Sequence, residues 1–462
     1  MDAQGNQYAE LLRSALTGQL VAEGSIHDAR VAAAFHAVPR HEFVPLVPLQ
    51  VAYADDVVLM KRDNTGAVIS SVSQPSVVAL MLEQAGVQPG HRVLEIGSGG
   101  YNAALLSELV GPGGAVTTVD IDPEVVERAR QGLSIAGYDD VRVVLADGEF
   151  GSPESAPYDR ILVTVTAWDI APAWVEQLAE HGRIVVPLRF RGQTRSIALD
   201  LVDGRLESRS TRLCGFVCMQ GAGASYERVV LLEKDSVSLG FDTDQEIVEP
   251  PDDVLRSPAT QVWSGVVVDP EEPLADLNLW LASTLDQYCV LLADHSALNK
   301  RLVAPTPRWG TSATIADDTL TYLSSRPTKD EYLLELGVIA HGPAAVEHAD
   351  QMVNQIQTFD TQRRDGPGPV LTIHPASPSG DAAEEPRQAA SAEEPPPAAP
   401  AEEPSSGGPA AESLSAAPGE ESAAGEPAVE QAMVARVGAP GSEGFVRLRM
   451  DRPHSRLVVS WP

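Results

Sequence analysis

Short β-branched segments alternate with helical segments between residues 92 and 188, and this alternation restricts the fold more than any other feature of the sequence. The β-branched segments span 92–96, 115–120, 141–145, 161–166 and 183–188. The helical segments span 101–110, 123–137 and 171–179. Strands that alternate with helices build parallel sheets, because each crossover helix carries the chain back to the same end of the sheet. The sequence therefore predicts an α/β fold in which helices cover a parallel sheet.

A hairpin is predicted after the fifth strand, and it distinguishes two kinds of sheet. Residues 197–201 alternate up to the turn Asp203–Gly204, and residues 206–213 can return antiparallel. A Rossmann-like class I methyltransferase sheet ends in such a hairpin, whereas a dinucleotide-binding sheet normally continues with crossover helices. Upstream, residues 7–38 predict two helices, and Ser25 is the expected N-cap of the second.

Residues 381–430 differ in composition from the rest of the chain. Pro, Ala, Glu, Ser and Gly dominate, and Leu414 and Val429 are the only large apolar side chains there. Such a segment buries too little apolar surface to offset the conformational entropy that it would lose on folding. A disordered acidic linker is therefore expected at 381–432. Alternating apolar residues predict strands on both sides, at 370–373 and 446–461. The linker is therefore expected to interrupt a second, α+β domain.

Four segments are expected along the chain. A methyltransferase-type domain with N-terminal helices covers 1–230, and an accessory α+β domain covers 231–380. The disordered linker at 381–432 follows, and C-terminal strands at 433–462 are expected to complete the accessory domain. This organisation agrees with a length of 462 residues, which allows more than one core.

Charge and cysteine content exclude several function classes. The 33 Lys and Arg residues face 65 Asp and Glu residues, for a net charge of −32. Nucleic acid and anionic membranes are poor partners for such a chain, because both are bound largely through Lys and Arg. No long apolar segment or signal-peptide pattern occurs, so a cytoplasmic location is expected. Cys214, Cys218 and Cys289 lack metal-ligand spacing, so no metal site is expected.

A glycine-rich turn follows the first strand of the predicted parallel sheet. The turn Gly97–Ser98–Gly99–Gly100 connects this strand to a helix, and small residues there allow the backbone to approach a ligand closely. An ordinary tight turn is the alternative interpretation. A dinucleotide-binding fingerprint would require a third glycine at position 102, where the chain has Asn102, and this disfavours a nicotinamide cofactor.

Acidic residues follow the next two strands. Asp120 ends the second strand, where a carboxylate can accept both hydroxyl groups of a ribose. Asp147–Gly148 follows the third strand, where the acid can accept a hydrogen bond from an adenine amine, although an Asx turn is the alternative. Three successive strand ends with small or acidic residues therefore predict one adenosyl site at this edge of the sheet.

Motifs in the first half of the chain resemble the protein-L-isoaspartate O-methyltransferase family, in order and at similar spacing. They are Val-Pro-Arg-His-Glu-Phe-Val-Pro at 38–45, Ala-Tyr-Ala-Asp at 52–55, Ile-Ser-Ser-Val-Ser-Gln-Pro at 69–75, Leu-Glu-Ile-Gly-Ser-Gly-Gly-Tyr-Asn-Ala-Ala-Leu at 94–105 and Ala-Pro-Tyr-Asp at 156–159. The resemblance implies S-adenosyl-L-methionine as cofactor and a peptide carboxylate as methyl acceptor. One departure concerns the glycine loop, because the family usually has Gly-x-Gly-x-Gly-Tyr and this loop is one residue shorter.

The resemblance also assigns roles to individual residues. It places Glu95 and the loop Gly97, Ser98, Gly99 and Gly100 at the methionine end of the cofactor. It places Asp120 at the ribose and Asp147 with Gly148 at the adenine. Ser73 is assigned to the substrate carboxylate, as the catalytic residue that orients it, and Gln74 and Trp168 are expected beside the substrate.

The chemistry of a carboxylate acceptor agrees with these assignments. A peptide carboxyl group has an ordinary pKa near about 4, so at neutral pH it is already an anionic nucleophile and needs no general base. A hydroxyl such as that of Ser73 can hold one carboxylate oxygen and leave the other free to react. The alternative role of Ser73 is that of a helix N-cap before Pro75. The alternative role of Trp168 is that of a packed core indole.

A narrower resemblance concerns the 97–100 loop and the C-terminal sequence at 454–461, which are similar to the lanthipeptide-associated FxLD-system branch of the family. It implies esterification of an aspartate in a cyclised precursor peptide, followed by a succinimide and then isoaspartate. General repair of L-isoaspartyl damage in proteins is one alternative. A nicotinamide-dependent oxidoreductase and a non-catalytic adenosyl-binding scaffold are alternatives of other classes.

A basic segment near the C-terminus is a hypothetical contact for an acidic peptide. It contains Arg447, Arg449, Arg452, His454 and Arg456. The alternative interpretation is that these are exposed charges on edge strands.

Overall fold

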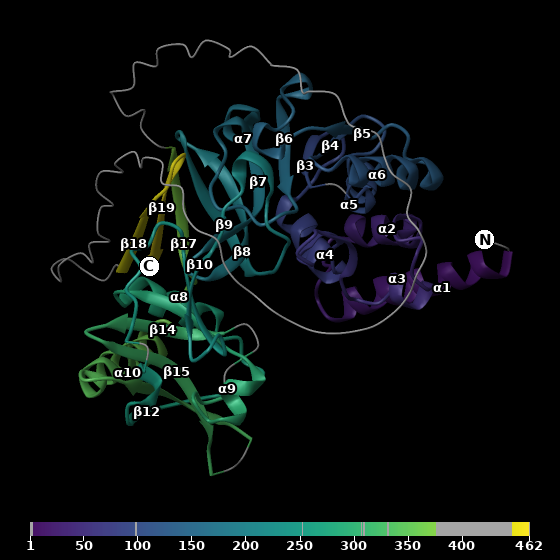
Figure 1. Cartoon of the computed structure of the whole chain (residues 1–462). Helices are drawn as coiled ribbons and strands as arrows, with labels where there is room; N and C mark the ends of the chain where they lie inside the picture. The colour runs from purple at the N-terminus through teal and green to yellow at the C-terminus, as the bar shows by residue number, and fades with distance from the viewer. Residues whose placement is uncertain are drawn as a thin grey trace, which may run out of the picture. The chain divides into compact units, whose positions relative to one another are not determined.

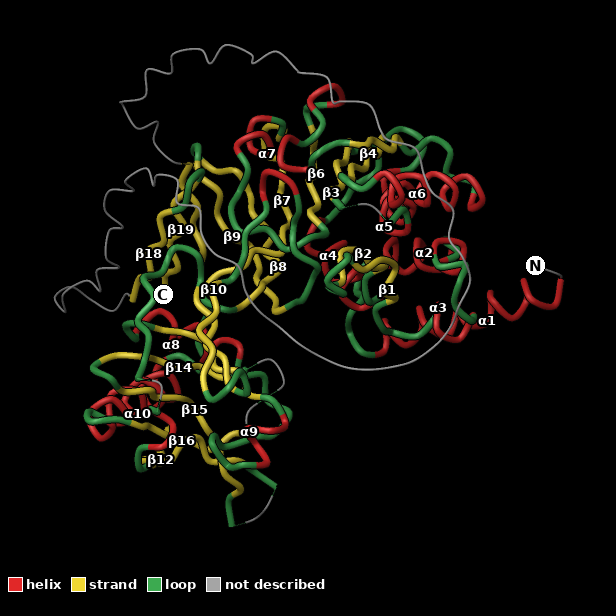
Figure 2. The backbone as a smooth tube through the Cα atoms, viewed as in Figure 1, coloured by secondary structure: helices red, strands yellow, loops and turns green. Residues whose placement is uncertain are grey.

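The computed structural model describes residues 3–97, 99–251, 253–305, 307, 310–329, 332–375 and 446–461. These residues form a ten-stranded, a seven-stranded and a two-stranded sheet together with helices (Figures 1 and 2). The acidic linker expected at 381–432 lies outside the described residues.

The ten-stranded sheet contains the predicted parallel strands. In spatial order its strands are β18 (Val446–Asp451), β19 (Ser455–Trp461), β17 (Val370–Pro375), β9 (Arg205–Leu213), β8 (Gln193–Val202), β7 (Leu178–Phe190), β6 (Tyr158–Val163), β3 (Arg92–Ile96), β4 (Ala115–Asp120) and β5 (Arg142–Leu145). The pairs from β5 to β7 are parallel, and the pairs β7–β8 and β8–β9 are antiparallel. The predicted α/β fold with an antiparallel terminal hairpin is therefore confirmed.

The last three strands extend this sheet and not the second one. In β17, Ile373 pairs with Leu206 of β9 and Leu371 pairs with Val459 of β19. The expectation that C-terminal strands at 433–462 complete the accessory domain is therefore wrong for the described residues 446–461, which belong to the ten-stranded sheet. Apolar alternation identifies a strand but does not predict the sheet to which the strand belongs. Here β17 pairs with the edge of β9 that β8 leaves open. The domain limits at 1–230 and 231–380 remain proposals.

Helices and a small hairpin accompany the parallel strands. They are α1 (Ala3–Ala22), α2 (Ala29–Ala37), α3 (Leu49–Ala52), α4 (Pro75–Ala85), α5 (Tyr101–Val110), α6 (Pro123–Ala136), α7 (Pro172–Glu176), the 3-10 turns η1 (Arg40–Phe43), η2 (Gly148–Phe150) and η3 (Pro153–Ser155), and the hairpin β1 (Val58–Arg62) and β2 (Val68–Val72). The N-cap of α2 is Asp28 and not the expected Ser25, since the Asp28 carboxylate accepts the Arg30 N–H at 2.8 Å. Both residue types favour this position, so the sequence alone does not separate them.

The central parallel strands are buried on both faces. Leu94 and Ile96 of β3 belong to one apolar cluster, together with Ile161 of β6. Val93 and Leu162, which alternate with them, belong to a second cluster that contains residues of α2, α4 and α5. Successive strand side chains point to opposite faces, so a slip of one residue would exchange the two sets. This double burial holds the strand ends in register.

The seven-stranded sheet is antiparallel and forms the predicted accessory α+β part. Its spatial order is β10 (Arg228–Leu232), β11 (Val237–Phe241), β13 (Tyr288–Ala293), β14 (Thr311–Ala316), β15 (Thr319–Pro327), β16 (Leu334–His341) and β12 (Ala259–Val268). The elements η4 (Gly221–Gly223), η5 (Val254–Arg256), α8 (Ala275–Thr284), α9 (His295–Asn299) and α10 (Ala345–Gln362) belong to the same part of the chain.

Side chains from both large sheets meet around α8. Trp280 of α8 lies edge-on to Trp461 of β19, with ring centroids 5.5 Å apart, and Val338 of β16 belongs to the same cluster. Arg195 of β8, whose side chain is 2% exposed, donates to the Asp276 carboxylate at 2.8 Å. The accessory part therefore shares a core with the parallel sheet.

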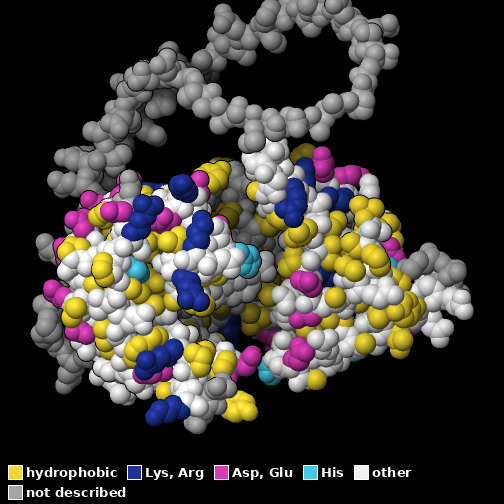
Figure 3. All heavy atoms as spheres, turned by 60° about the horizontal axis from the view of Figure 1, so that its bottom comes forward, with side chains coloured by type: hydrophobic (Ala, Val, Ile, Leu, Met, Phe, Trp, Pro, Cys, Tyr) yellow, Lys and Arg dark blue, Asp and Glu magenta, His cyan; other side chains and the backbone are white. Residues whose placement is uncertain are grey.

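None of the described helices is long and apolar enough to cross a membrane. On the face that Figure 3 shows, Lys and Arg side chains are interspersed with Asp and Glu side chains.

The Arg195–Asp276 pair provides a test of this shared core. Arg195→Met should lower the free energy of unfolding by about 2 kcal/mol, because it removes the hydrogen bonds that the buried guanidinium donates to Asp276 and to the Ala275 carbonyl. The matched control is Arg209→Met. Arg209 also pairs with a carboxylate, that of Asp200, at 2.8 Å, but its side chain is 51% exposed. The control should cost less than about 1 kcal/mol in urea unfolding. Equal losses for the two variants would contradict a shared core.

Candidate active site

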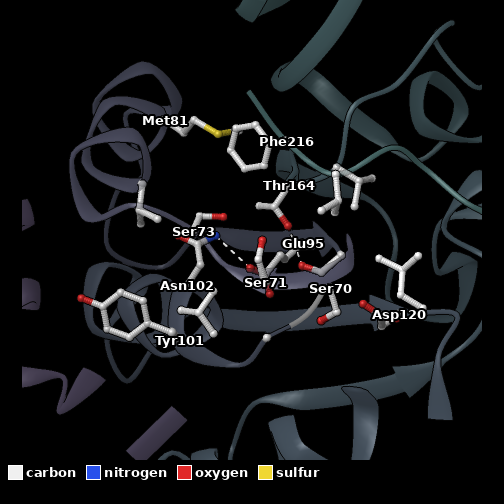
Figure 4. A pocket seen from close by; sticks show the side chains of 17 residues that line it. Ser70, Ser71, Ser73, Met81, Glu95, Tyr101, Asn102, Asp120, Thr164 and Phe216 are labelled. Carbon is white, nitrogen blue, oxygen red and sulfur yellow. Dashed lines mark hydrogen bonds between the residues drawn. The ribbon is translucent and has the colours of Figure 1, made fainter. Parts of the chain in front are cut away.

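A cavity lies at the carboxyl edge of the parallel strands, where β3, β4 and β6 end. Its lining includes Ser73 before α4, Glu95 of β3, Asp120 of β4 and Thr164 after β6. Figure 4 shows Tyr101 and Asp120 on opposite sides of the view, with Glu95, Thr164 and the serines between them. The sheet topology therefore brings the ends of three strands to one cavity, as the sequence predicts.

Glu95 is a buried carboxyl group inside this cavity. It accepts hydrogen bonds from Thr118 Oγ1 at 2.5 Å and from Asn102 Nδ2 at 2.9 Å, the second of which is drawn in Figure 4. Burial raises the pKa of the Glu95 carboxyl to about 7, although both hydrogen bonds act in the opposite direction. The site thus contains an acid that changes protonation close to neutral pH.

The glycine loop adopts a conformation that requires glycine at two positions. Gly97 has a φ of 93°, and a Cβ there would lie 2.8 Å from Thr164 Oγ1. Gly100 has a φ of 83°, and its Cβ would lie 3.1 Å from the Phe43 ring. Gly97 and Gly99 line the cavity, whereas Gly100 caps α5. Ser98 lies outside the described residues. Tight packing therefore accounts for Gly97 and Gly100 without a ligand.

The two acidic strand ends behave differently. Asp120 lines the cavity, and its Oδ1 accepts the Asp122 N–H at 2.8 Å. Asp147 accepts the Glu149 N–H at 3.0 Å and the Ala222 N–H at 2.8 Å, and it does not line the cavity. The alternative Asx turn at Asp147 is therefore present. Its neighbour Gly148 is buried against Ile96.

The position of Ser73 depends on two residues of the motifs in the first half of the chain. Buried Arg40 donates to the carbonyl oxygens of Ala52 at 2.9 Å and of Val72 at 3.4 Å. Asp55 accepts the Ser76 N–H at 2.8 Å, so this carboxylate stabilises the start of α4. The alternative role of Ser73 as N-cap is wrong, because Gln74 occupies that position. Among the described residues, no hydrogen bond occupies the Ser73 hydroxyl.

The other two predicted substrate contacts lie outside this cavity. Gln74 Nε2 donates to Asp55 at 3.0 Å. Trp168 lines a second cavity, and the Arg452 guanidinium lies 4.1 Å from the centroid of its ring. Trp168 is half-buried, so neither the predicted wall of the catalytic cavity nor a packed core indole describes it.

Several lining residues were not predicted. Thr164 follows β6, and the rule that ligands bind at the carboxyl ends of parallel strands would have indicated it. Met81 and Phe216 also line the cavity, and Figure 4 draws both at one side of the polar residues. Phe216 follows the terminal hairpin, where no sequence pattern marks it as a site residue.

The basic segment near the C-terminus is largely paired within the chain. Arg449 and Arg456 both pair with Asp451, at 3.4 and 2.5 Å. Arg452 is buried and donates to the carbonyl oxygens of Trp168 and Arg189. Arg449 and Arg456 have half-exposed side chains on β18 and β19, which agrees with the alternative of exposed charges on edge strands, whereas Arg452 has a structural role. Within the described part of the chain, no group of His, Cys, Asp and Glu has the arrangement of a metal site.

Comparisons with known proteins concern the part of the chain that holds this cavity. Residues 11–223 match the family described as Protein-L-isoaspartate(D-aspartate) O-methyltransferase (PCMT). The chain is 40% identical over 222 residues to the protein-L-isoaspartate O-methyltransferase of Methanopyrus kandleri, a match that covers 47% of this chain and 96% of that protein. It is 40% identical over 219 residues to the enzyme of the same name from Hyperthermus butylicus, covering 45% of this chain and 88% of that protein.

One solved structure named protein-L-isoaspartate O-methyltransferase is also similar. It matches at a TM-score of 0.44 and 23% identity, over 78% of this chain and 96% of that one.

Glu95→Gln should change how stability depends on pH. The folded-state pKa of about 7 lies above the ordinary value of 4.5, so between these values the folded protein keeps a proton that the unfolded chain has lost. Wild-type stability therefore falls as pH rises through this window. The difference in unfolding free energy, wild type minus variant, should fall by up to about 3 kcal/mol from about pH 4.5 to about pH 7.5.

The measurement is chemical denaturation at several pH values. Glu180→Gln is the control, because the Glu180 side chain is 91% exposed and carries the same charge. A wild-type-minus-Glu95→Gln difference that stays constant over this pH range would contradict the burial of an ionisable Glu95.

Proposed function

The chain belongs to the protein-L-isoaspartate O-methyltransferase family, and we propose that it esterifies an aspartyl or isoaspartyl carboxylate in a ribosomal, lanthipeptide-type precursor peptide. As a member of this family it is an O-methyltransferase that depends on S-adenosyl-L-methionine. A backbone nitrogen of the proposed substrate then attacks the ester carbonyl carbon and displaces methanol, and the resulting succinimide hydrolyses to isoaspartate. The observation that carries the proposal is the cavity that joins Glu95, Asp120 and Ser73.

The polar groups of the cavity suit the cofactor. Asp120 stands at the end of β4, where its carboxylate can accept ribose hydroxyls. Glu95, near the start of α5, would stand at the methionine end, where an ionised carboxylate can accept from the ammonium group. Asp147 and Gly148 remain the proposed adenine contacts. A carboxylate oxygen has two acceptor sites, so the present bonds of Asp147 leave room for another.

The chain's own residues then have simple tasks in methyl transfer. The cofactor supplies an electrophilic methyl group on sulfur, and the substrate carboxylate is already ionised at neutral pH. The Ser73 hydroxyl, held beside Val72 by Arg40, can orient one carboxylate oxygen. Met81 and Phe216 supply apolar surface that excludes water from the reacting groups. Positioning of this kind can lower a barrier by about 7–11 kcal/mol, so no catalytic base is needed.

Residues beyond the family match support a dedicated peptide substrate. The match ends at residue 223, and the Methanopyrus kandleri relative corresponds to 47% of this chain. The remaining described residues contribute three strands to the catalytic sheet and a buried Arg452 next to Trp168. General repair of isoaspartyl damage would not need this addition, but it stays the second candidate because the catalytic part alone matches the curated relatives.

Mass spectrometry with two classes of peptide tests the proposal. The protein, with S-adenosyl-L-methionine, is incubated with an isoaspartyl peptide and with cyclised precursor peptides that contain aspartate. We expect a gain of about 14 Da, or a loss of about 18 Da after succinimide formation, on a precursor peptide, and hydrazine should trap the ester. Turnover of the simple isoaspartyl peptide alone would favour repair. No modification of any peptide would support the non-catalytic scaffold.

Two substitutions should separate the roles of Ser73 and Asp120. Ser73→Ala removes a charge-assisted hydrogen bond to the acceptor and should lower kcat by about 10- to 100-fold with little change in cofactor Kd. Asp120→Asn should instead raise the cofactor Kd by about tenfold or more. Ser134→Ala, on the exposed side of α6, is the control. A Ser73→Ala variant with the wild-type kcat would show that Ser73 has no role in methyl transfer.

A further inference from the structure

A second cavity adjoins the catalytic one, and the proposed reaction does not use it. Its lining includes Thr166, Trp168, Arg189, Cys218, Glu227 and Asp242. It encloses about 100 Å³, several times the space of about 10–15 Å³ that a single water needs. Glu227 and Asp242 lie beyond residue 223, so part of this cavity belongs to the region that the family match does not include.

The two cavities share one wall. Thr164 and Val165 line the catalytic cavity, and Thr166 lines the second. On the neighbouring segment, Val217 lines the first and Cys218 the second. The Thr166 N–H donates to the Val217 carbonyl at 2.8 Å, which ties the two segments together. Val165 and Thr166 are consecutive along the chain, as are Val217 and Cys218, and extended backbone advances about 3.3 Å per residue. An extended peptide bound in one cavity would therefore reach the other within a few residues.

The walls of the second cavity are held in place from behind. Arg452, in the turn between β18 and β19, lies 4.1 Å from the centroid of the Trp168 ring. It donates to the Trp168 carbonyl, and to the Arg189 carbonyl at 2.9 Å. Asp242 accepts the N–H groups of Arg191 and Gly192, which fixes its carboxylate against the β7–β8 turn. A cavity built this way keeps its shape before a ligand arrives.

The charges around the cavity favour a cationic ligand group. Arg189 lines the cavity and pairs with Glu227 at 2.5 Å, whereas the Asp242 carboxylate accepts the backbone N–H groups of Arg191 and Gly192. Buried Arg452 stands behind the indole and not in the lining, and the carboxylates of Asp169, Asp242 and Asp244 and the guanidinium of Arg191 act on its charge. The lining therefore carries one more negative than positive charge, and the hydroxyl of Thr166 offers a further acceptor.

We infer that the second cavity is a specificity subsite that receives a lysine or arginine side chain of the peptide substrate, two or three residues away from the carboxylate that is methylated. The inference rests on the proposed function, because the position of the cationic side chain is counted from the peptide carboxylate that is methylated. Complementary charge at such a subsite selects among peptides and leaves the methyl transfer itself unchanged.

Peptides that differ at a single position test the subsite. A cyclised precursor peptide with one aspartate is made with Ala, Lys or Glu at two and at three residues on either side of that aspartate. With the wild-type full-length protein, the best Lys peptide should show a kcat/KM about tenfold above its Glu counterpart. Glu227→Lys should reverse this preference, and Glu227→Gln should reduce it. Both variants are checked for folding by thermal unfolding.

The control is Glu180→Lys, which makes the same charge change on a side chain that is 91% exposed on β7. It should keep the wild-type preference. Equal kcat/KM for Lys and Glu peptides at every position would overturn the subsite while leaving methyl transfer to the Ala peptide intact. A Lys preference that survives Glu227→Lys would also overturn it. Failure to methylate any peptide of the series would overturn the proposed function and the subsite together.

Discussion

The double burial of the central parallel strands is the constraint on which the site depends. Leu94 and Val93 alternate into two separate apolar clusters, and the same is true of Ile161 and Leu162. Because a shift of either strand by one residue would exchange the side chains that pack into the two clusters, the ends of β3 and β6 are fixed relative to each other. Glu95 and Thr164 stand at these ends. The geometry of the cavity is therefore a consequence of packing that involves no ligand.

Periodicity predicted the parallel part of the fold closely, since the limits of β3 and β4 agree with the expected 92–96 and 115–120. Burial on both faces leaves a strong β-branched signal in such strands. The C-terminal strands were also recognisable, but their sheet was not, because pairing partners such as Leu206 and Ile373, which lie 373 − 206 = 167 residues apart, leave no local signal. The choice of Asp28 over Ser25 as N-cap, and of Gln74 over Ser73, depends on tertiary contacts such as that between Asp55 and Ser76.

The site was predicted best where residues follow strand ends. Ser73, Glu95 and Asp120 meet in one cavity, while Asp147 is bonded to a neighbouring turn and Trp168 to Arg452. The last two contacts involve residues 75 and 284 positions away. Rules based on sequence spacing describe residues that are close along the chain, so they do not predict these two contacts. The same long-range contact makes Arg452 of the basic C-terminal segment a structural support for Trp168 and Arg189, whereas Arg449, His454 and Arg456 have half-exposed side chains.

The central claim is that one crevice at this sheet edge holds S-adenosyl-L-methionine. Isothermal titration calorimetry with S-adenosyl-L-homocysteine and, in parallel, with NAD tests it most directly on the full-length protein. The account predicts saturable binding of S-adenosyl-L-homocysteine at a single site per chain and no heat from NAD. Absence of binding by S-adenosyl-L-homocysteine to the folded protein, or tighter binding of NAD, would contradict it.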